Sequence, residues 1–396
     1  MRVWSRRPPI AMTSSPAPLT LSKEPGTPAV APEARSGLAG PPASAPRILV
    51  LDPLRGLAAA SVTWFHFTNG RWLAEGKGIG PWLGASGAKG WLGVEVFFVI
   101  SGFVLPYAMW RGRYRLRSYG RFLVKRLLRL EPPYLITLAL TIGLLLASSF
   151  VPGFRGEEFT VRWPQLLLHF GYLNAFTEYP WYNPVFWTLA IEFQFYLLIA
   201  LTFPLVVHDH LGVRVAAPLT MATLVFLPTP PSLVFHFLPL FALGIATVQR
   251  SMGLIPKRLY ALMFTVLTAT AIVGIGWWEA GVGVATALVI TTLGSATPES
   301  FAGRILQWRP LVWLGAVSYS LYLLHVPVGG RVINLGQRFT DGTLGQIAVL
   351  AAAIAVTLIA TVILYRFVER PAQRWSSRLR YTKPTPAADV PASGDA

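Results

Sequence analysis

Residues 344–366 read LGQIAVLAAAIAVTLIATVILYR, and the only charged residue in this run is the arginine at its end. An α-helix needs about 20 mostly apolar residues to cross the hydrocarbon core of a bilayer. The run meets that requirement without interruption. It therefore decides the class of fold, because a chain with such a segment is expected to be held in a membrane by helices.

The composition of the whole chain agrees with that expectation. Of 396 residues, 53% are hydrophobic and 13% are charged, whereas an average soluble domain has about 25% charged residues. Lys and Arg outnumber Asp and Glu by 34 to 17, a net charge of +17. This basic excess alone would suit nucleic-acid binding, but the apolar excess excludes that class and indicates a lipid bilayer as the partner. The lack of cysteine excludes disulfides and a thiol nucleophile.

Ten stretches are candidate spans, although some are short or contain proline. They lie near 50–68, 91–110, 131–150, 184–207, 213–228, 233–249, 260–278, 282–297, 310–328 and 344–366. We therefore predict an all-α, polytopic integral membrane protein with about ten transmembrane helices. An eleventh stretch, 164–176, is too short to cross easily and is predicted to be a re-entrant or interfacial segment.

The ends of the chain differ from its middle. Residues 1–47 and 376–396 are rich in Pro, Ala, Ser and Gly, which predicts disordered tails around a transmembrane domain at 48–375. Short cytoplasmic loops accumulate Lys and Arg, and the stretch 111–129 carries eight basic residues and no acid. Counting spans from this stretch predicts a multi-pass protein of the cell membrane with both termini in the cytoplasm.

Ionisable side chains inside a span are costly and by default indicate function. In LDPLRGLAAASVTWFHF (51–67), Arg55 and His66 are eleven residues apart. This spacing places them on nearly the same helix face, about 16 Å apart along the axis. An interfacial arginine and a histidine bonded to a neighbouring helix would explain the pair equally well.

Two further spans contain a carboxylate. Glu95 lies in GWLGVEVFFVISGFVL (90–105), six residues before Ser101, and Glu192 lies in FWTLAIEFQFYLL (186–198), one turn before Tyr196 on the same face. The competing interpretations are structural: either carboxylate can pair with an arginine. The glycines of the first stretch can simply allow close helix packing.

The basic stretch continues into RFLVKRLLRLEPPYL (121–135), where Arg126 and Arg129 are one helical turn apart and share a face. Two guanidinium groups on one face suit the capture of phosphate, although anchoring at the membrane surface explains them as well. The prolines at 132 and 133 are predicted to break or kink the helix. In GAVSYSLYLLHVPV (315–328), His325 can either complete a helix end or take part in chemistry. No metalloprotease, Walker or nucleophile-elbow motif is present, and no metal is expected.

Taken in order, these stretches resemble the integral-membrane acyltransferases called acyltransferase family 3, which include O-antigen and macrolide O-acyltransferases. Six stretches across residues 49–370 carry the resemblance, and the last of them is YRFVERPAQR. The family's motif of Arg, ten residues and His matches Arg55 and His66. Its RxxR motif matches Arg126 and Arg129, and its Trp…Glu motif matches Trp187 and Glu192. The family commonly has Asp where this chain has Glu95.

The resemblance implies transfer of an acyl group, expected to be acetyl, from acyl-coenzyme A to a hydroxyl of a sugar-containing acceptor such as a polysaccharide, a lipid-linked sugar or a macrolide. A hydroxyl needs a base, and His66 has the most suitable pKa for that task. Arg55 would hold the donor, Glu192 would orient the acceptor or His66, and Arg126 and Arg129 would bind coenzyme A. The residues expected to contact substrate are Glu95, Ser101, Trp187, Tyr196 and His325. The alternative is a transporter or flippase of an anionic or sugar-linked molecule. The lack of an internal repeat argues against this alternative, because many transporters are built from such repeats.

Overall fold

The computed structural model describes residues 48–70, 81–150, 159–340 and 342–381. These residues belong to one compact unit of the chain, Leu38–Ala396. The predicted N-terminal tail at 1–47 and most of the predicted C-terminal tail lie outside the described residues.

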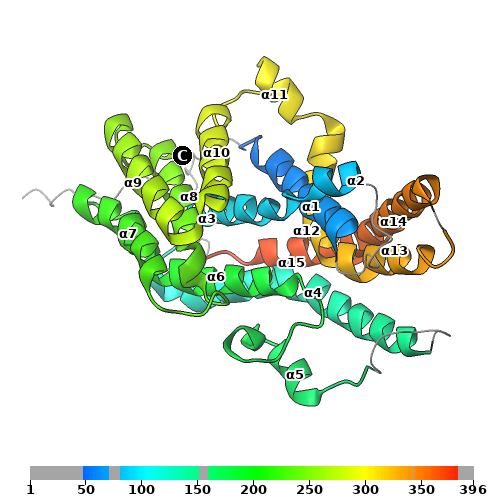
Figure 1. Ribbon diagram of the computed structural model, residues 1–396. Coiled ribbons are helices and arrows are strands. Elements are labelled where there is room, and N and C mark those ends of the chain that lie inside the picture. The colour runs from blue at the N-terminus through cyan, green and yellow to red at the C-terminus, as the bar shows by residue number, and fades with distance from the viewer. Residues whose placement is uncertain (1–47, 71–80, 151–158, 341, 382–396) are drawn as a thin grey trace, which may run out of the picture. The chain divides into compact units, whose positions relative to one another are not determined.

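The regular structure of the described residues is helical throughout, which confirms the all-α prediction (Figure 1). The α-helices are α1 (Leu51–Asn69), α2 (Pro81–Gly87), α3 (Gly93–Arg111), α4 (Tyr119–Ser149), α5 (Trp163–Leu168), α6 (Phe186–Val206), α7 (Leu211–Thr223), α8 (Leu238–Ser251), α9 (Lys257–Ile275), α10 (Trp277–Leu293), α11 (Phe301–Leu306), α12 (Arg309–Leu324), α13 (Gly330–Gly336), α14 (Thr343–Leu364) and α15 (Arg370–Arg378). Short 3-10 helices join several of them, including η1 (Gly90–Leu92), η3 (Leu173–Phe176) and η5 (Val234–Phe237). Two π-helical turns, η6 (His325–Gly329) and η7 (Tyr365–Glu369), link α12 to α13 and α14 to α15.

Seven helical stretches of the described residues are long and apolar enough to cross a membrane. They are Trp82–Arg111, Leu116–Ser149, Phe186–Val206, Val234–Ser251, Lys257–Ile275, Arg309–Gly336 and Thr343–Arg378. Two shorter apolar helices, Leu211–Phe226 and Trp277–Leu293, match two more predicted spans. The one remaining predicted span, at 50–68, is α1. Its 19 residues are long enough to cross a membrane but include polar and charged side chains. The segment 164–176 forms only α5 and η3, both too short to cross.

Helix α4 corrects part of one prediction, that the prolines at 132 and 133 break or kink the helix. The helix is not broken and runs from Tyr119 to Ser149. Proline removes an N–H from the helix and leaves a carbonyl group without its usual donor. The carbonyl groups that lose their donors are those of Leu128 and Arg129, four residues before each proline. The neighbouring helix α12 contacts α4 just beside them, because the hydroxyl of Tyr319 donates to the carbonyl oxygen of Leu130 at 2.9 Å.

The C-terminal boundary is also corrected, because residues 376–381 belong to the folded body. Helix α15 extends to Arg378, and the side chain of Tyr381 is buried. The carbonyl oxygen of Tyr381 accepts hydrogen bonds from Ser118 and Arg121, each at 3.2 Å. Its ring packs edge-on against Tyr114, 5.6 Å between centroids. These contacts are tertiary, and the composition of the tail does not reveal them.

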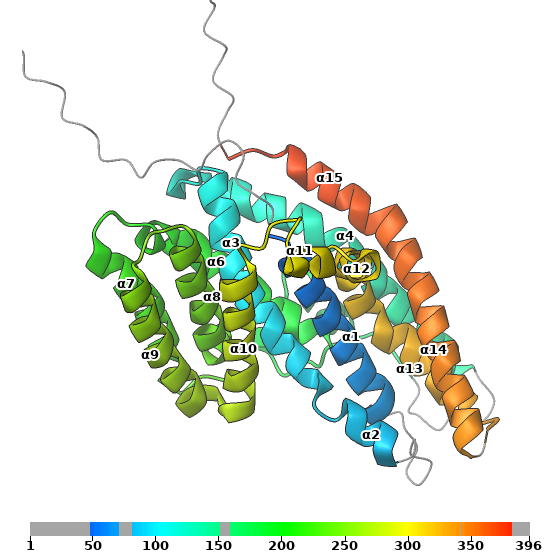
Figure 2. The ribbon, with the colours of Figure 1, turned by 90° about the horizontal axis from the view of Figure 1, so that it is seen from above.

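Glycines set the closest helix contacts, and these contacts position the site. Helices α1 and α12 meet at Gly56 and Gly315, where a Cβ on Gly56 would lie 2.7 Å from the backbone nitrogen of Gly315. Helices α3 and α8 meet in the same way at Gly102 and Gly244. Figure 1 shows α1 beside α12, and Figure 2 shows α15 running along α4. The close-packing interpretation of Gly102 therefore holds.

Candidate active site

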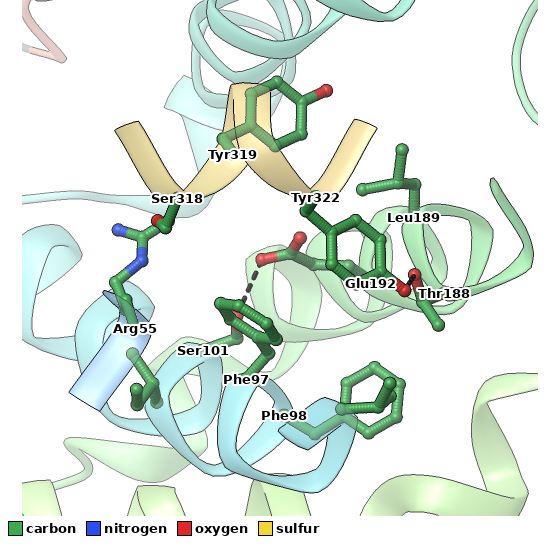
Figure 3. A pocket seen from close by; sticks show the side chains of 12 residues that line it. Arg55, Phe97, Phe98, Ser101, Thr188, Leu189, Glu192, Ser318, Tyr319 and Tyr322 are labelled. Atoms are coloured by element: carbon green, nitrogen blue, oxygen red, sulfur yellow. Dashed lines mark hydrogen bonds between the residues drawn. The ribbon is translucent and has the colours of Figure 1, made fainter. Parts of the chain in front are cut away.

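A small cavity of about 50 Å³ lies between α1, α3, α6 and α12 (Figure 3). We call it the central cavity. Its polar lining residues are Arg55, Ser101, Thr188, Glu192, Ser318, Tyr319 and Tyr322. Three residues predicted for the site, Arg55, Ser101 and Glu192, are therefore brought together from three different helices.

The carboxylate of Glu192 is held by a hydroxyl group. Ser101 Oγ donates a hydrogen bond of 2.7 Å to Oε1 of Glu192, the dashed line between these residues in Figure 3. Tyr196, one turn later on α6, interacts with the same carboxylate. The guanidinium of Arg55 lies beside Ser318 at the edge of the same cavity. A carboxylate and a guanidinium that face one small space can orient a polar group of a substrate.

The three arginines of the predicted site form one electrostatic cluster. Arg129 interacts with both Arg55 and Arg126, and with the carboxylate of Glu369. The guanidinium of Arg126 is buried and lies over the ring of Tyr196, 5.8 Å from its centroid. Arg126 and Arg129 therefore share the face of α4 that points towards α1 and α6. Because three cations face two acids, Glu369 and Glu192, the cluster keeps an excess of positive charge that suits phosphate groups.

Glu369 is a candidate residue that the sequence pattern does not single out. Its side chain is buried in η7 and accepts hydrogen bonds from the backbone N–H of Ser320 at 3.1 Å and from Gln373 Nε2 at 2.8 Å. It also interacts with the charges of Arg129 and Arg55. The available signal is its place in YRFVERPAQR, where one acid stands among three arginines.

His66 and His325 form a hydrogen-bonded pair between α1 and η6. Nδ1 of His66 lies 2.9 Å from the carbonyl oxygen of Val62 and 3.1 Å from Nε2 of His325. Nδ1 of His325 lies 3.2 Å from the carbonyl oxygen of Leu321. Because a carbonyl oxygen only accepts, the hydrogen-bond network assigns the proton of each neutral ring to Nδ1. Nε2 of His325 then accepts from His66, and Nε2 of His66 carries the lone pair that can take up a proton.

A second, larger cavity of about 560 Å³ contains His66 in its wall, and we call it the wide cavity. Its polar lining residues are His66, Asn69, Thr141, Tyr182, Asn183, Arg331 and Asn334. Apolar walls come from Phe65, Leu145, Pro184, Val326 and Pro327. Its volume falls within the range of roughly 300 to 1,000 Å³ that is common for small-molecule sites.

His325 and Tyr322 connect the two cavities. The ring of His325 is fully buried between them, 5.6 Å from the ring of Tyr322 between centroids. The hydroxyl of Tyr322 is 2.8 Å from Oγ1 of Thr188 in the central cavity. The π-helical turn that begins at His325 places this ring against α1, and such turns are frequent at functional sites.

Of the five predicted substrate contacts, only Ser101 lines a cavity. Tyr196 and His325 contact residues that do, Glu192 and His66, whereas Glu95 and Trp187 lie apart from both cavities. The side chain of Glu95 is buried, and its carboxyl group interacts electrostatically with that of Glu279 on α10. Its Oε2 atom has no hydrogen-bond partner. Trp187 packs on the ring of Phe237, 5.7 Å between centroids. Neither residue lines the central or the wide cavity, so their positions support packing rather than contact with a substrate.

The wall of the wide cavity is supported by a histidine that the sequence does not single out. His169 lies between α5 and η3, stacked on the ring of Tyr182 at 5.2 Å. Burial lowers the pKa of His169 to about 4, so its ring is neutral at ordinary pH. The backbone N–H of Tyr182 bonds to its Nε2 at 3.5 Å, and its Nδ1 is 2.8 Å from the hydroxyl of Tyr134. No group of three His, Asp or Glu side chains in the described part of the chain could hold a metal ion.

Residues 48–366 match the family described as the acyltransferase domain, and the chain belongs to that family. The predicted family is thereby confirmed. The fold and the family together define a multi-pass helical membrane protein of the acyltransferase domain family. This membership favours the acyltransferase interpretation over the transporter alternative.

Several curated relatives are similar over most of this chain. The O-acetyltransferase OatA of Staphylococcus aureus is 25% identical over 367 residues, covering 82% of this chain and 57% of OatA. The acyltransferase MdmB of Streptomyces mycarofaciens is 29% identical over 391 residues, covering 87% of this chain and 97% of MdmB. YrhL of Bacillus subtilis, named as a candidate peptidoglycan O-acetyltransferase, is 27% identical, covering 81% of this chain and 54% of YrhL. The chain thus spans little more than half the length of OatA and YrhL. No solved structure matches the chain.

Proposed function

We propose that this enzyme transfers an acetyl group from acetyl-coenzyme A to a hydroxyl of a sugar-containing acceptor, with His66 as the general base. The observation that carries the proposal is the His66–His325 pair, because it leaves the lone pair on Nε2 of a ring that lines the wide cavity. The relatives support O-acylation as the reaction, since OatA is named an O-acetyltransferase.

The reaction needs two proton transfers: one from the acceptor hydroxyl to His66, and one to the thiolate that leaves. Nε2 of His66 takes the proton of the acceptor hydroxyl as its oxygen attacks the thioester carbonyl. The carbon–sulfur bond then breaks, and the thiolate of coenzyme A leaves and takes up a proton. The ester forms without an acyl-enzyme on sulfur, because the chain has no cysteine. Arg55 and Glu192, in the central cavity, would hold the donor and orient the reacting groups.

The donor is proposed to enter from the end of the helices that carries the basic residues. The cluster of Arg55, Arg126 and Arg129 offers positive charge to the phosphates of coenzyme A. Tyr381, near the C-terminus, bonds to Ser118 and Arg121 of the basic stretch, so this end of the chain lies beside it. The positive-inside rule then orients the basic stretch and the C-terminus towards the cytoplasm. The N-terminus is proposed to lie on the same side.

Replacing Arg129 by glutamine is expected to raise the KM for acetyl-coenzyme A roughly tenfold, because a hydrogen bond to a charged group contributes about 1.5 to 3 kcal/mol. The turnover number should change much less, because Arg129 is placed to bind phosphate and not the reacting atoms. Steady-state kinetics on purified protein with labelled acetyl-coenzyme A measure both quantities. Arg117→Gln, which removes an exposed charge from the same basic stretch, is the matched control. Equal KM values in the two variants would contradict the donor site.

Replacing His325 by alanine is expected to lower the turnover number by roughly 10- to 100-fold, because His66 loses the neighbouring ring that orients it, although the carbonyl oxygen of Val62 still holds its proton on Nδ1. His325→Gln should recover much of the loss, since the amide oxygen of glutamine can accept the same hydrogen bond. The KM for acetyl-coenzyme A should stay close to that of the unchanged enzyme. A loss that glutamine does not repair would indicate that His325 only fills space.

A further inference from the structure

Arg331, in the wall of the wide cavity, is a cation with no acidic partner among the residues that the structure describes. It is the second residue of α13, and its side chain is half-buried. One hydrogen bond holds it in place: Nη1 donates to Oγ of Ser148 on α4 at 2.8 Å. A guanidinium has five N–H donors in a planar fork, so most of the donors of Arg331 remain for a ligand.

The charge of Arg331 is not balanced within its cavity. None of the lining residues is Asp or Glu, and Arg331 is the one permanently charged side chain among them. No hydrogen bond to an acid is formed by its guanidinium in the described part of the chain. Because a partly desolvated charge is stabilised by a counter-charge, the cavity favours a ligand that brings an anion.

The surroundings of Arg331 fit a polar ligand of the size of a sugar. Asn334 follows one turn later on the same helix and lines the same cavity. The ring of Tyr182 and the amide of Asn183 contribute to the wall, and His66 lines it too. An acceptor that binds its anion at Arg331 would therefore share one space with the proposed base.

We propose that the wide cavity is the acceptor site and that its acceptor is an anionic saccharide, whose carboxylate or phosphate binds Arg331 while a hydroxyl reaches Nε2 of His66. This inference rests on the proposed function, because it takes the cavity of the base to be that of the acceptor. It narrows the class of acceptor from sugars in general to acidic sugars and sugar phosphates.

The binding test does not need activity. Phenylglyoxal modifies free guanidinium groups, and peptide mass spectrometry reports the modification of each arginine separately. The full chain, solubilised in dodecyl maltoside, is treated with phenylglyoxal in separate samples. Each sample contains one protecting ligand: methyl glucuronide, glucose 1-phosphate, methyl glucoside, acetyl-coenzyme A or phosphatidylglycerol. Exposed Arg338, seven residues away, is the internal control in every sample.

We expect methyl glucuronide or glucose 1-phosphate to slow the labelling of Arg331 several-fold while leaving that of Arg338 unchanged. Methyl glucoside should give no protection. The anion that protects Arg331 more strongly shows whether the site prefers a carboxylate or a phosphate. Protection by neither anion overturns the proposal. Protection by phosphatidylglycerol or acetyl-coenzyme A alone also overturns it, because Arg331 would then bind a lipid headgroup or the donor.

The acceptor itself gives a second test. Cells that express the chain are compared with cells that express His66→Ala, and the acetyl esters present only in the former are analysed by mass spectrometry. We expect those esters on molecules that carry a carboxylate or phosphate, and their loss in Arg331→Gln but not in Arg338→Gln. A neutral acetylated product overturns the acidic acceptor while leaving the proposed reaction standing. If no ester depends on His66, the proposed function fails, and the labelling result still decides whether the cavity binds anions.

Discussion

His66→Ala is expected to lower the rate of acetyl transfer by about 10²- to 10⁴-fold, the usual contribution of a positioned general base. The physical reason is the geometry of the histidine pair. Nδ1 of His66 is 2.9 Å from a backbone carbonyl and 3.1 Å from His325, so the basic nitrogen is Nε2. Alanine removes that nitrogen, and no other titratable ring lines the wide cavity except the hydroxyl-bearing ring of Tyr182.

The measurement uses membranes or cells that contain the chain. It follows the incorporation of labelled acetyl groups into their glycans and, for cells, into the molecules that they secrete. His208→Ala, an exposed histidine between α6 and α7, is the control for loss of an imidazole away from the site. Both variants are checked for equal amounts in the membrane. A His66→Ala protein that inserts normally and retains full acetylation would exclude His66 as the base.

Gly315→Ala is expected to destabilise the protein by about 1 to 3 kcal/mol or more, the usual range for forcing an extra group into a packed interface. The new Cβ atom would clash with the carbonyl oxygen of Asp52, which belongs to the backbone of α1 and cannot turn away. The helices α1 and α12 would have to separate. Because α1 carries Arg55 and His66, and α12 leads into His325, activity should fall together with stability.

Thermal unfolding in detergent, followed by size-exclusion chromatography, measures the effect. The matched control is Gly143→Ala in α4, where a Cβ atom meets nothing within 4 Å. That change should be neutral or stabilise the helix by up to about 1 kcal/mol, since alanine favours a helix more than glycine does. The two glycine variants therefore have opposite expected signs. Equal melting temperatures in both would contradict the role of Gly315 as the contact between the helices.

The spans could be predicted because hydropathy is a local property. The run at 344–366 needs no partner to be recognised, and it forms α14 with the π-helical turn η7 after it. The continuity of α4 through its two prolines could not be predicted, because the contacts of α4 with other helices join distant parts of the chain. Tyr319 donates to the carbonyl oxygen of Leu130 across a separation of 189 residues. The same holds for the order of residues 379–381, whose carbonyl oxygens accept from Arg121 and Lys125 on α4.

In the candidate site, too, some features could be predicted from the local sequence and others could not. Helical periodicity alone placed Arg55 and His66 on one face of α1, and it placed Arg126 and Arg129 on one face of α4. Periodicity says nothing about which other helix those faces meet. For this reason Glu95 and Trp187 looked as suitable as Ser101, although only Ser101 reaches the central cavity.

The order of residues therefore determines the class of this protein: its apolar runs require a membrane, and its few ionisable groups within those runs mark the helices of the candidate site. Only the tertiary structure supports the proposed chemistry, because the contact on which it rests joins His66 to His325 over 259 positions of the chain. The same is true of Arg331, whose importance comes from a cavity that it shares with His66. Hydropathy and helical period act within one segment, whereas the tautomer of a histidine and the balance of a buried charge depend on whatever the fold places beside them.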